Sequence, residues 1–235
     1  MTATGSPAGG QPPGELTGRS AVLLATALAT KGFLPADEAM ALYAVAVRAA
    51  ASATGPLVEI GAYLGRSTLL LAAALAAAGA AGPVVYSVDH HHGSEEMQAG
   101  WPDHEPSLVD PRTGRMDSLG AWRRAIEMAG AEDLVVGVVG DSARVAANWS
   151  TRAALVFIDG GHGAGPCWAD YRGWARHVAA GGFLVLHDVF PDPAEGGRPP
   201  YECYLDALGS GRFTEDSAAS CRSLRVLVRT AQPWD

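Results

Sequence analysis

The stretch of sequence that decides the fold is residues 154–162, which read ALVFIDGGH. Five apolar residues in a row are typical of a strand that is buried on both faces in the centre of a parallel sheet. Directly after this run come Asp159, two glycines and His162. Because ligands bind past the carboxyl ends of strands in open α/β sheets, Asp159 and His162 are expected where such a sheet builds its active site.

A second stretch of the same kind follows at residues 182–188, which read GFLVLHD. It predicts another buried strand, which is followed directly by Asp188. If the two strands are neighbours in one parallel sheet, His187 and Asp188 lie at the same edge as Asp159 and His162. The sequence therefore predicts a cluster of carboxylate and imidazole groups.

Composition excludes several classes of partner. The chain has 235 residues, enough for one α/β domain, and a formal net charge of -8 without a run of lysine and arginine, so nucleic acid and anionic membranes are not expected to bind. Three cysteines without Cys-x-x-Cys spacing fit a reducing compartment. The longest apolar run is shorter than the roughly 20 residues of a membrane span, and no secretory signal is recognisable, so we expect a cytoplasmic protein.

The pattern of apolar runs and turn residues divides the chain into three parts. Residues 1–18 are rich in glycine and proline and predict a disordered arm, and residues 19–53 predict two helices that serve as a cap or an oligomer arm. Residues 54–235 predict one domain. Its expected strands are residues 57–61, 84–89, 134–139, 154–158, 183–187, 212–215 and 223–229, and its expected helices are residues 66–78, 119–129, 166–178 and 201–208.

This order of elements predicts a Rossmann-like, doubly wound α/β fold. The sheet is expected to have seven mostly parallel strands, with an antiparallel strand near the C-terminus. The irregular residues 90–117 are too long for an idle connection and predict a lid or acceptor-binding loop. Three adjacent histidines at 90–92 cannot all turn to one ion, so a loop role is favoured over a zinc site.

The turn after the first strand carries a pattern of glycines, Glu59-x-Gly61-x-x-x-Gly65. Glycines let the backbone approach a ligand, and the helix that follows offers free N–H groups to an anion. A dinucleotide site would need Gly-x-Gly-x-x-Gly, and bulky Tyr63 stands where the middle glycine admits the pyrophosphate. The pattern therefore disfavours NAD.

This turn resembles the first motif of class I S-adenosylmethionine-dependent methyltransferases. The resemblance implies that the turn holds the amino-acid part of S-adenosylmethionine, with Ser67 bonding its carboxylate. It places Asp89 at the ribose, and Asp141 and Ser142 at the adenine. Each residue has an alternative role in a turn or helix cap. The expected cofactor-binding residues are Glu59, Gly61, Tyr63, Gly65, Ser67, Asp89, Asp141, Ser142 and Asp159.

The two central strand ends suit metal-assisted methyl transfer to a hydroxyl group. Asp159 and Asp188 offer the hard oxygen ligands that Mg²⁺ prefers. A divalent cation lowers the pKa of a coordinated water from ~16 to ~7, and a coordinated alcohol should respond similarly. His162 is then expected as the general base, since an unperturbed imidazole has a pKa of ~6.5. Its alternative role is that of a helix-capping loop residue.

Asp159-x-x-His162, with Asp188 after the next strand, resembles the metal-dependent sugar O-methyltransferases of macrolide tailoring. In that family Asp-x-x-His supplies a ligand and the base, and Glu-Asp supplies two more ligands. This chain has His187 in place of the glutamate. His187 is expected as the third ligand, and a softer ion, a bridging water or a ring that faces away are the alternatives.

Over most of its length the chain resembles the actinobacterial 1-O-methyltransferases of methylmannose polysaccharide synthesis. The resemblance implies a short mannoside as acceptor and a homodimer. Two other functions stay open from the sequence. One is metal-dependent methyl transfer to a phenolic, catechol or antibiotic acceptor; a phenol would need less help from a base, since phenols ionise near pH 10. A non-catalytic cofactor-binding module would not need the cluster of Asp159, His162 and Asp188.

Overall fold

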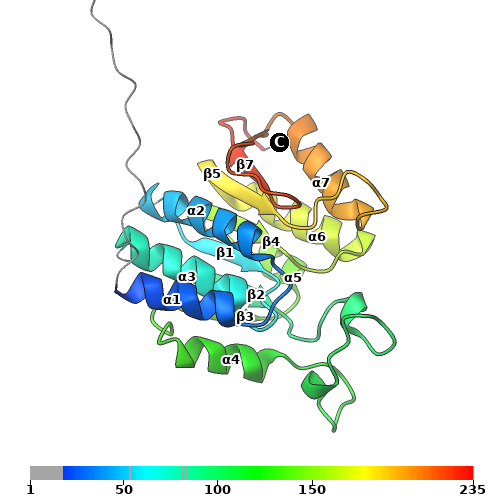
Figure 1. Ribbon diagram of the computed structural model, residues 1–235. Helices are drawn as coiled ribbons and strands as arrows, with labels where there is room; N and C mark the ends of the chain where they lie inside the picture. Colours follow the sequence, from blue (N-terminus) through cyan, green and yellow to red (C-terminus); the bar gives the residue numbers. More distant parts are fainter. Residues whose placement is uncertain (1–17, 53, 81, 83, 235) are drawn as a thin grey trace, which may run out of the picture.

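The computed structural model describes residues 18–52, 54–80, 82 and 84–234, so all of the expected disordered arm except Gly18 lies outside the described residues. Seven strands form one sheet in the order β3-β2-β1-β4-β5-β7-β6 (Figure 1). The strands are β1 (Leu57–Ile60), β2 (Val85–Asp89), β3 (Val135–Val139), β4 (Ala153–Ile158), β5 (Val178–Leu186), β6 (Phe213–Glu215) and β7 (Arg225–Arg229). β1 to β5 are parallel, and β7 is antiparallel to β5 and β6, which confirms the predicted fold.

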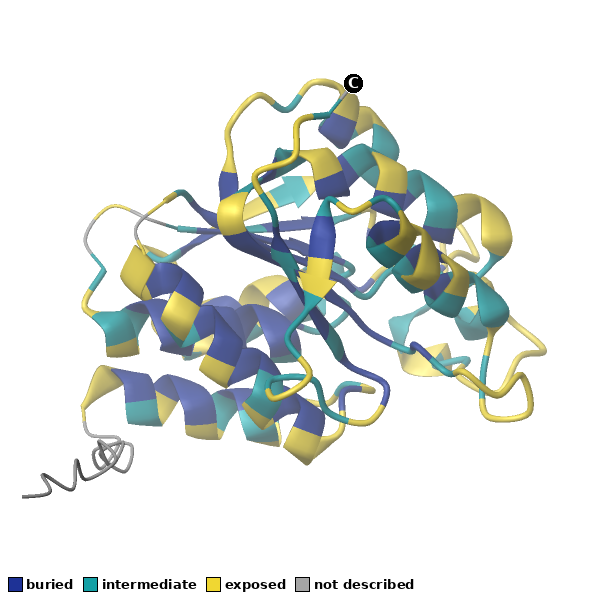
Figure 2. Ribbon diagram, turned by 90° about the horizontal axis from the view of Figure 1, so that it is seen from above, coloured by how far each residue is buried: buried dark blue, intermediate teal, exposed yellow. Residues whose placement is uncertain are grey.

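Helices cover both faces of the sheet, as Figure 2 shows from above. One face carries α1 (Arg19–Ala29), α2 (Ala36–Ser52), α3 (Arg66–Ala78) and α4 (Leu119–Met128), and the other carries α5 (Ser142–Ala147), α6 (Ala164–Trp174) and α7 (Arg198–Gly209). Short 3-10 turns are η1 (Glu95–Met97), η2 (Pro106–Leu108) and η3 (Ala175–His177). None of the helices in the described ranges is long and apolar enough to cross a bilayer.

The predicted helix over residues 166–178 was wrong at its end. The helix α6 stops at Trp174, and the chain passes through η3 directly into β5, which begins at Val178. The strand contains Gly181 at a φ of 77°, and its register with β4 shifts between Ala153 and Leu155. A left-handed glycine in a strand marks a bulge, and this bulge hides the start of β5 from the apolar pattern. The short helix α5 was also missed.

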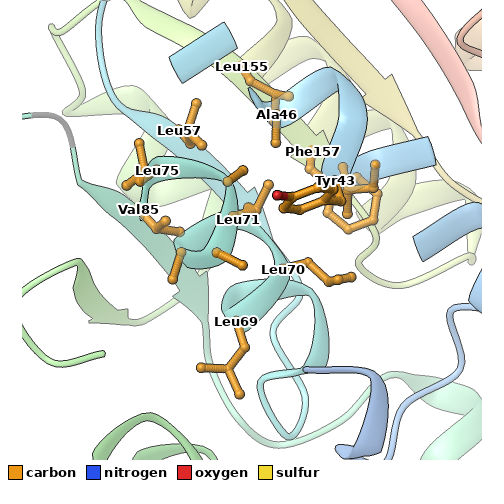
Figure 3. Packing of buried hydrophobic residues seen from close by; sticks show 14 of the residues in the cluster. Tyr43, Ala46, Leu57, Leu69, Leu70, Leu71, Leu75, Val85, Leu155 and Phe157 are labelled. Atoms are coloured by element: carbon orange, nitrogen blue, oxygen red, sulfur yellow. The ribbon is translucent and has the colours of Figure 1, made fainter. Parts of the chain in front are cut away.

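The helix α3 is apolar all round because other elements cover every side of it. Nine consecutive residues, Ser67 to Leu75, are buried. Its leucines meet Leu57 of β1, and Figure 3 shows them in one cluster with Leu155, Phe157, Tyr43 and Ala46. α2 lies beside α3 and also packs on β1, β4 and β5, and α1 packs on α3. The N-terminal helices are therefore a layer of the main core.

The register of the central strands brings their carboxyl ends together. Ile60 pairs with Ile158, and Ile158 pairs with Leu186. The residues that follow these three, Gly61, Asp159 and His187, consequently start at one level of the sheet edge. The predicted site residues at the ends of β1, β4 and β5 therefore meet at this edge.

Candidate active site

A cavity of about 920 Å³ opens at the carboxyl edge of the parallel strands. The predicted site residues that line it are Gly61, Tyr63, Ser67, Asp89, Asp141, Ser142, Asp159, His162 and Asp188. Glu59, Gly65 and His187 do not line it. Nine of the twelve predicted site residues therefore lie at one cavity, and the other three have other positions.

The glycine turn after β1 needs glycine for two separate reasons. Gly61 has a φ of 89°, and a Cβ there would collide with the carbonyl oxygen of Asp159, the residue that follows β4. Gly65 has a φ of 95° and directly precedes α3. A Cβ on Gly65 would lie 3.3 Å from the Trp122 ring. Gly61 thus lets the turn approach β4 at the cavity. Gly65 starts the helix against α4.

Glu59 supports this turn from below and does not reach the cavity. It has no exposed surface, and its Oε2 accepts hydrogen bonds from Thr68 Oγ1 and Ser87 Oγ, both at 2.6 Å. Burial raises the pKa of Glu59 to about 7 despite these hydroxyl donors. The expected direct contact between Glu59 and a cofactor is corrected accordingly, because the carboxyl group ties β1, β2 and α3 together beneath the turn.

Asp89 closes the turn from β2. Its Oδ2 accepts hydrogen bonds from the backbone N–H groups of Ala62 at 2.9 Å and Tyr63 at 3.0 Å, and its Oδ1 accepts one from His91 N at 2.7 Å. Tyr63 itself has a φ of 46°, a conformation that a bulky residue adopts only when its surroundings impose it. Asp89 therefore holds Tyr63 in place against the cavity.

Asp141 and Ser142 combine a helix-capping role with a place in the cavity wall. Asp141 is the N-cap of α5 and accepts a hydrogen bond from Arg144 N at 2.9 Å. The hydroxyl of Ser142 donates to Asp170 and accepts from Trp174 Nε1 at 3.2 Å. Burial raises the pKa of Asp170 to about 6, although the Ser142 hydroxyl opposes this. Asp170 lines the cavity too, and no motif of the sequence pointed to it.

Asp159, His162 and Asp188 form the chemical centre of the site. Among the described residues these three have ligand atoms that lie within 4.8 Å of one another, close enough to share a metal ion. Asp188 has a φ of 55°, a left-handed conformation that carries strain in a non-glycine residue and is typical of functional positions. The structure therefore brings together the expected base His162 and two of the expected metal ligands, Asp159 and Asp188.

His162 lies between two carboxylates. Its Nε2 is 2.8 Å from Asp188 Oδ2, and its Nδ1 is 3.7 Å from Glu96 Oε1. Burial opposes protonation of the ring, but Asp188, Asp159 and Glu96 outweigh it and raise the pKa of His162 to about 9. Burial likewise opposes ionisation of Asp188, and its two histidine neighbours still hold its pKa well below the usual range.

His187 is buried, with both ring nitrogens directed at carboxylates. Its Nε2 lies 2.8 Å from Glu38 Oε2, and its Nδ1 lies 2.9 Å from Asp159 Oδ1 and 3.2 Å from Asp188 Oδ2. Burial opposes protonation here as well, but Asp159 and the other carboxylates raise the pKa of His187 to about 12. His187 was expected as a third metal ligand. The geometry instead makes it a hydrogen-bonding partner of the two aspartates, outside the ligand cluster.

The loop over residues 90–117 forms one side of the cavity. Gly93, Glu96 and Asp103 of this loop line it, and Glu105 forms an ion pair with Lys31, between α1 and α2. The three adjacent histidines point to different partners: the ring of His91 bonds Ser118 at 2.9 Å, and that of His92 bonds the carbonyl of Met116 at 2.9 Å. The rings of His91 and His92 thus help to hold the loop against the residues just before α4.

A family model described as a methyltransferase domain matches residues 58–189 of the chain. The chain belongs to this methyltransferase family. Among solved structures it is similar to the O-methyltransferase NovP, with 17% identity and a TM-score of 0.61 over 82% of this chain and 79% of that one.

Two further structures show the same fold. The O-methyltransferase TomG from Streptomyces achromogenes, solved with S-adenosylmethionine, is 16% identical, with a TM-score of 0.59 over 89% of this chain and 90% of that one. CalS11, a TDP-rhamnose 3'-O-methyltransferase, is 12% identical, with a TM-score of 0.60 over 91% of this chain and 94% of that one. The methyltransferase therefore has the fold of S-adenosylmethionine-dependent O-methyltransferases, and its cavity lies at the strand edge where this fold binds ligands.

Proposed function

We propose that this methyltransferase transfers a methyl group from S-adenosylmethionine to a carbohydrate hydroxyl group, with a divalent metal ion held by Asp159 and Asp188. One observation carries the proposal: two carboxylates and an imidazole lie within 4.8 Å of one another beside a cavity of about 920 Å³. Fold maintenance does not require such a cluster. Together the three groups supply what methylation of an unactivated hydroxyl needs.

The cofactor half of the cavity is built from backbone turns and short polar side chains. The glycine turn at Gly61 and the N-terminus of α3 offer N–H groups to the carboxylate of the amino-acid part, beside Ser67. Asp89, Asp141 and Ser142 line the part of the cavity at β2 and β3 and suit the ribose and adenine. The cofactor supplies a methyl group that is already activated for displacement, so the protein has to orient it.

The donor set fits a hard divalent cation such as Mg²⁺. Carboxylate oxygens are its preferred protein ligands, and the remaining positions are commonly filled by water or substrate oxygen. When bound, the cation would lower the pKa of a coordinated hydroxyl group. His162 would then accept the hydroxyl proton. Asp188 and Asp159, which raise the pKa of His162, would also hold the cation, and neutralisation of their charge by the cation would lower this pKa and favour the ring as a base.

The charge of the cavity supports an uncharged acceptor. Carboxyl side chains along its wall outnumber the basic ones, which are Lys31 and Arg66. Lys31 is paired with Glu105, and Arg66 donates to the backbone carbonyls of Leu28 and Thr30. Such a wall repels phosphate groups. An enzyme that acts on a nucleotide-linked sugar would instead need free basic side chains for the diphosphate. A short neutral mannoside is the acceptor that we propose.

The proposal is tested with an acceptor panel. We expect radiolabelled S-adenosylmethionine to transfer its methyl group to short mannosides, with the transfer lost on addition of EDTA and restored by excess Mg²⁺. Methylation of catechols but not mannosides would favour the phenolic alternative. Cofactor binding without turnover on any acceptor would favour a non-catalytic module. Methylation of mannosides that EDTA leaves unchanged would contradict the metal ion.

The oligomeric state is a separate proposal. We expect a homodimer, in line with the resemblance and with the exposed apolar residues Val22 on α1 and Met40 on α2. Sedimentation equilibrium over a range of concentrations tests this. A monomer at all concentrations would contradict it.

A further inference from the structure

Glu38 on α2 is a buried carboxylate far from any motif of the sequence. It is 1% exposed, and its Oε1 accepts hydrogen bonds from Ser223 N at 2.7 Å and Ser223 Oγ at 2.8 Å. Its Oε2 lies 2.8 Å from His187 Nε2. The side chain thus occupies a fixed position with partners at both oxygens, and one of these partners is at the edge of the active site.

His187 continues the contact from Glu38 to the candidate metal cluster. With Nε2 directed at Glu38, the opposite nitrogen Nδ1 faces Asp159 Oδ1 at 2.9 Å and Asp188 Oδ2 at 3.2 Å. The imidazole is 5% exposed, so the protein encloses it on all sides. A planar ring with its Nε2 fixed presents Nδ1 in one direction only, between the two aspartates.

We propose that Glu38 is a positioning residue for the metal site, acting through His187. The carboxylate fixes the orientation of the imidazole, and the imidazole in turn fixes the two aspartate side chains at the separation that a divalent cation needs. Hydrogen-bonding partners behind metal ligands have this effect generally, and their loss costs about 10- to 100-fold in metal affinity. The inference rests on the proposed function, and it makes the N-terminal helix α2 part of the active site.

A merely structural role for Glu38 has a different signature. In that case Glu38 would serve only to anchor the backbone at Ser223, and its removal would lower stability without a specific effect on metal binding. Ser223→Ala is the matched control, because it removes one hydrogen bond to the same carboxylate and leaves the contact between Glu38 and His187 intact.

The test is a titration of the metal-stripped full-length protein with Mn²⁺, with free Mn²⁺ followed by electron paramagnetic resonance. We expect Glu38→Gln, which has the same shape without the charge, to weaken Mn²⁺ binding by about 10- to 100-fold. Ser223→Ala should bind Mn²⁺ like the wild type. The affinity for S-adenosylhomocysteine, measured by calorimetry, should be unchanged in both variants, since neither contact is part of the cofactor wall.

A second variant keeps the test decisive if Glu38→Gln does not fold. His187→Asn breaks the same connection at its next link and should weaken Mn²⁺ binding to a similar degree. In the His187→Asn background, Glu38→Gln should have no further effect. Wild-type Mn²⁺ affinity in either single variant would overturn the inference and leave the proposed function standing. Wild-type protein that binds no Mn²⁺, or Asp159→Asn that binds it normally, would overturn the metal site itself.

Discussion

His162 is the residue on which the proposed proton transfer depends, since its ring lies beside Asp188 and Glu96 at the cavity wall. We expect His162→Ala to lower kcat by about 10²- to 10⁴-fold, the usual contribution of a general base. The affinity for S-adenosylhomocysteine should stay unchanged. Mn²⁺ affinity separates two roles, because loss of a base leaves it intact and loss of a ligand weakens it. A native rate in the variant would contradict the assignment.

The buried carboxyl group of Glu59 should make the stability of the protein depend on pH. Its pKa is about 7 in the folded protein and 4.5 in the unfolded chain, so between these values the folded state binds the extra proton. The free energy of unfolding therefore falls as pH rises through this window, and levels off above pH 7. We expect Glu59→Gln, which resembles the protonated form, to lack this dependence, a difference of up to about 3 kcal/mol.

Urea unfolding of both proteins at pH 5 and pH 8 measures the difference. The wild type should lose stability relative to Glu59→Gln between the two values. Other titrating groups, His187 among them, contribute equally to both proteins and cancel. A difference between the proteins that does not change with pH would show that Glu59 is ionised throughout.

The sequence identified residues by their position after strands, and this rule found the cluster of Asp159, His162 and Asp188. It could not find Glu38, because a glutamate on a helix surface has no local pattern and its partner His187 is 149 residues away. Asp170 on α6 was missed for the same reason. The sequence placed Glu59 next to the glycine turn. It could not show that the side chain is buried beneath the turn, because this depends on how β1, β2 and α3 pack together.

At the scale of the elements, Arg66 connects α3 to the end of α1. Its Nη1 donates to the carbonyls of Leu28 and Thr30, both at 2.9 Å, which lie in the last turn of α1 and just after it, where carbonyls lack helical partners. Arg66→Met keeps the aliphatic stem and leaves these carbonyls without their donor. We expect a loss of about 1–3 kcal/mol in the free energy of unfolding, measured in urea. The exposed Arg123 on α4 provides the control, Arg123→Met, with little expected change.

Element boundaries were predictable where turn residues end an apolar run, as at β1, β2 and α3. They were not predictable where a strand contains its own glycines. Gly181 and its neighbour look like a loop in the sequence, yet they form the bulge in β5 that lets the strand begin at Val178. The helix α5 has only six residues, which is too short for a helical period to be recognised.

The whole molecule has its N-terminal helices inside the core, although the sequence allowed a cap or an oligomer arm equally well. The sequence of an amphipathic helix that precedes a sheet does not show which surface its apolar face covers. The indication lies in α3 instead: it is apolar on every side, so other elements have to cover the sides of α3 that the sheet leaves open. The boundary expected at residue 54 therefore does not separate two independent units of packing.

Unfolding experiments test whether this shared core makes the molecule cooperative. Leu42 on α2 has no exposed surface, and we expect Leu42→Ala to cost about 2–5 kcal/mol, as Leu70→Ala on α3 should. Met128, 86% exposed at the end of α4, gives the control Met128→Ala with a small effect. Circular dichroism and tryptophan fluorescence should report one coincident transition in each variant, because α2 and the sheet share one core. Two transitions, with the later one unaffected by Leu42→Ala, would instead mean that the sheet keeps its structure without α2, which would contradict a single shared core.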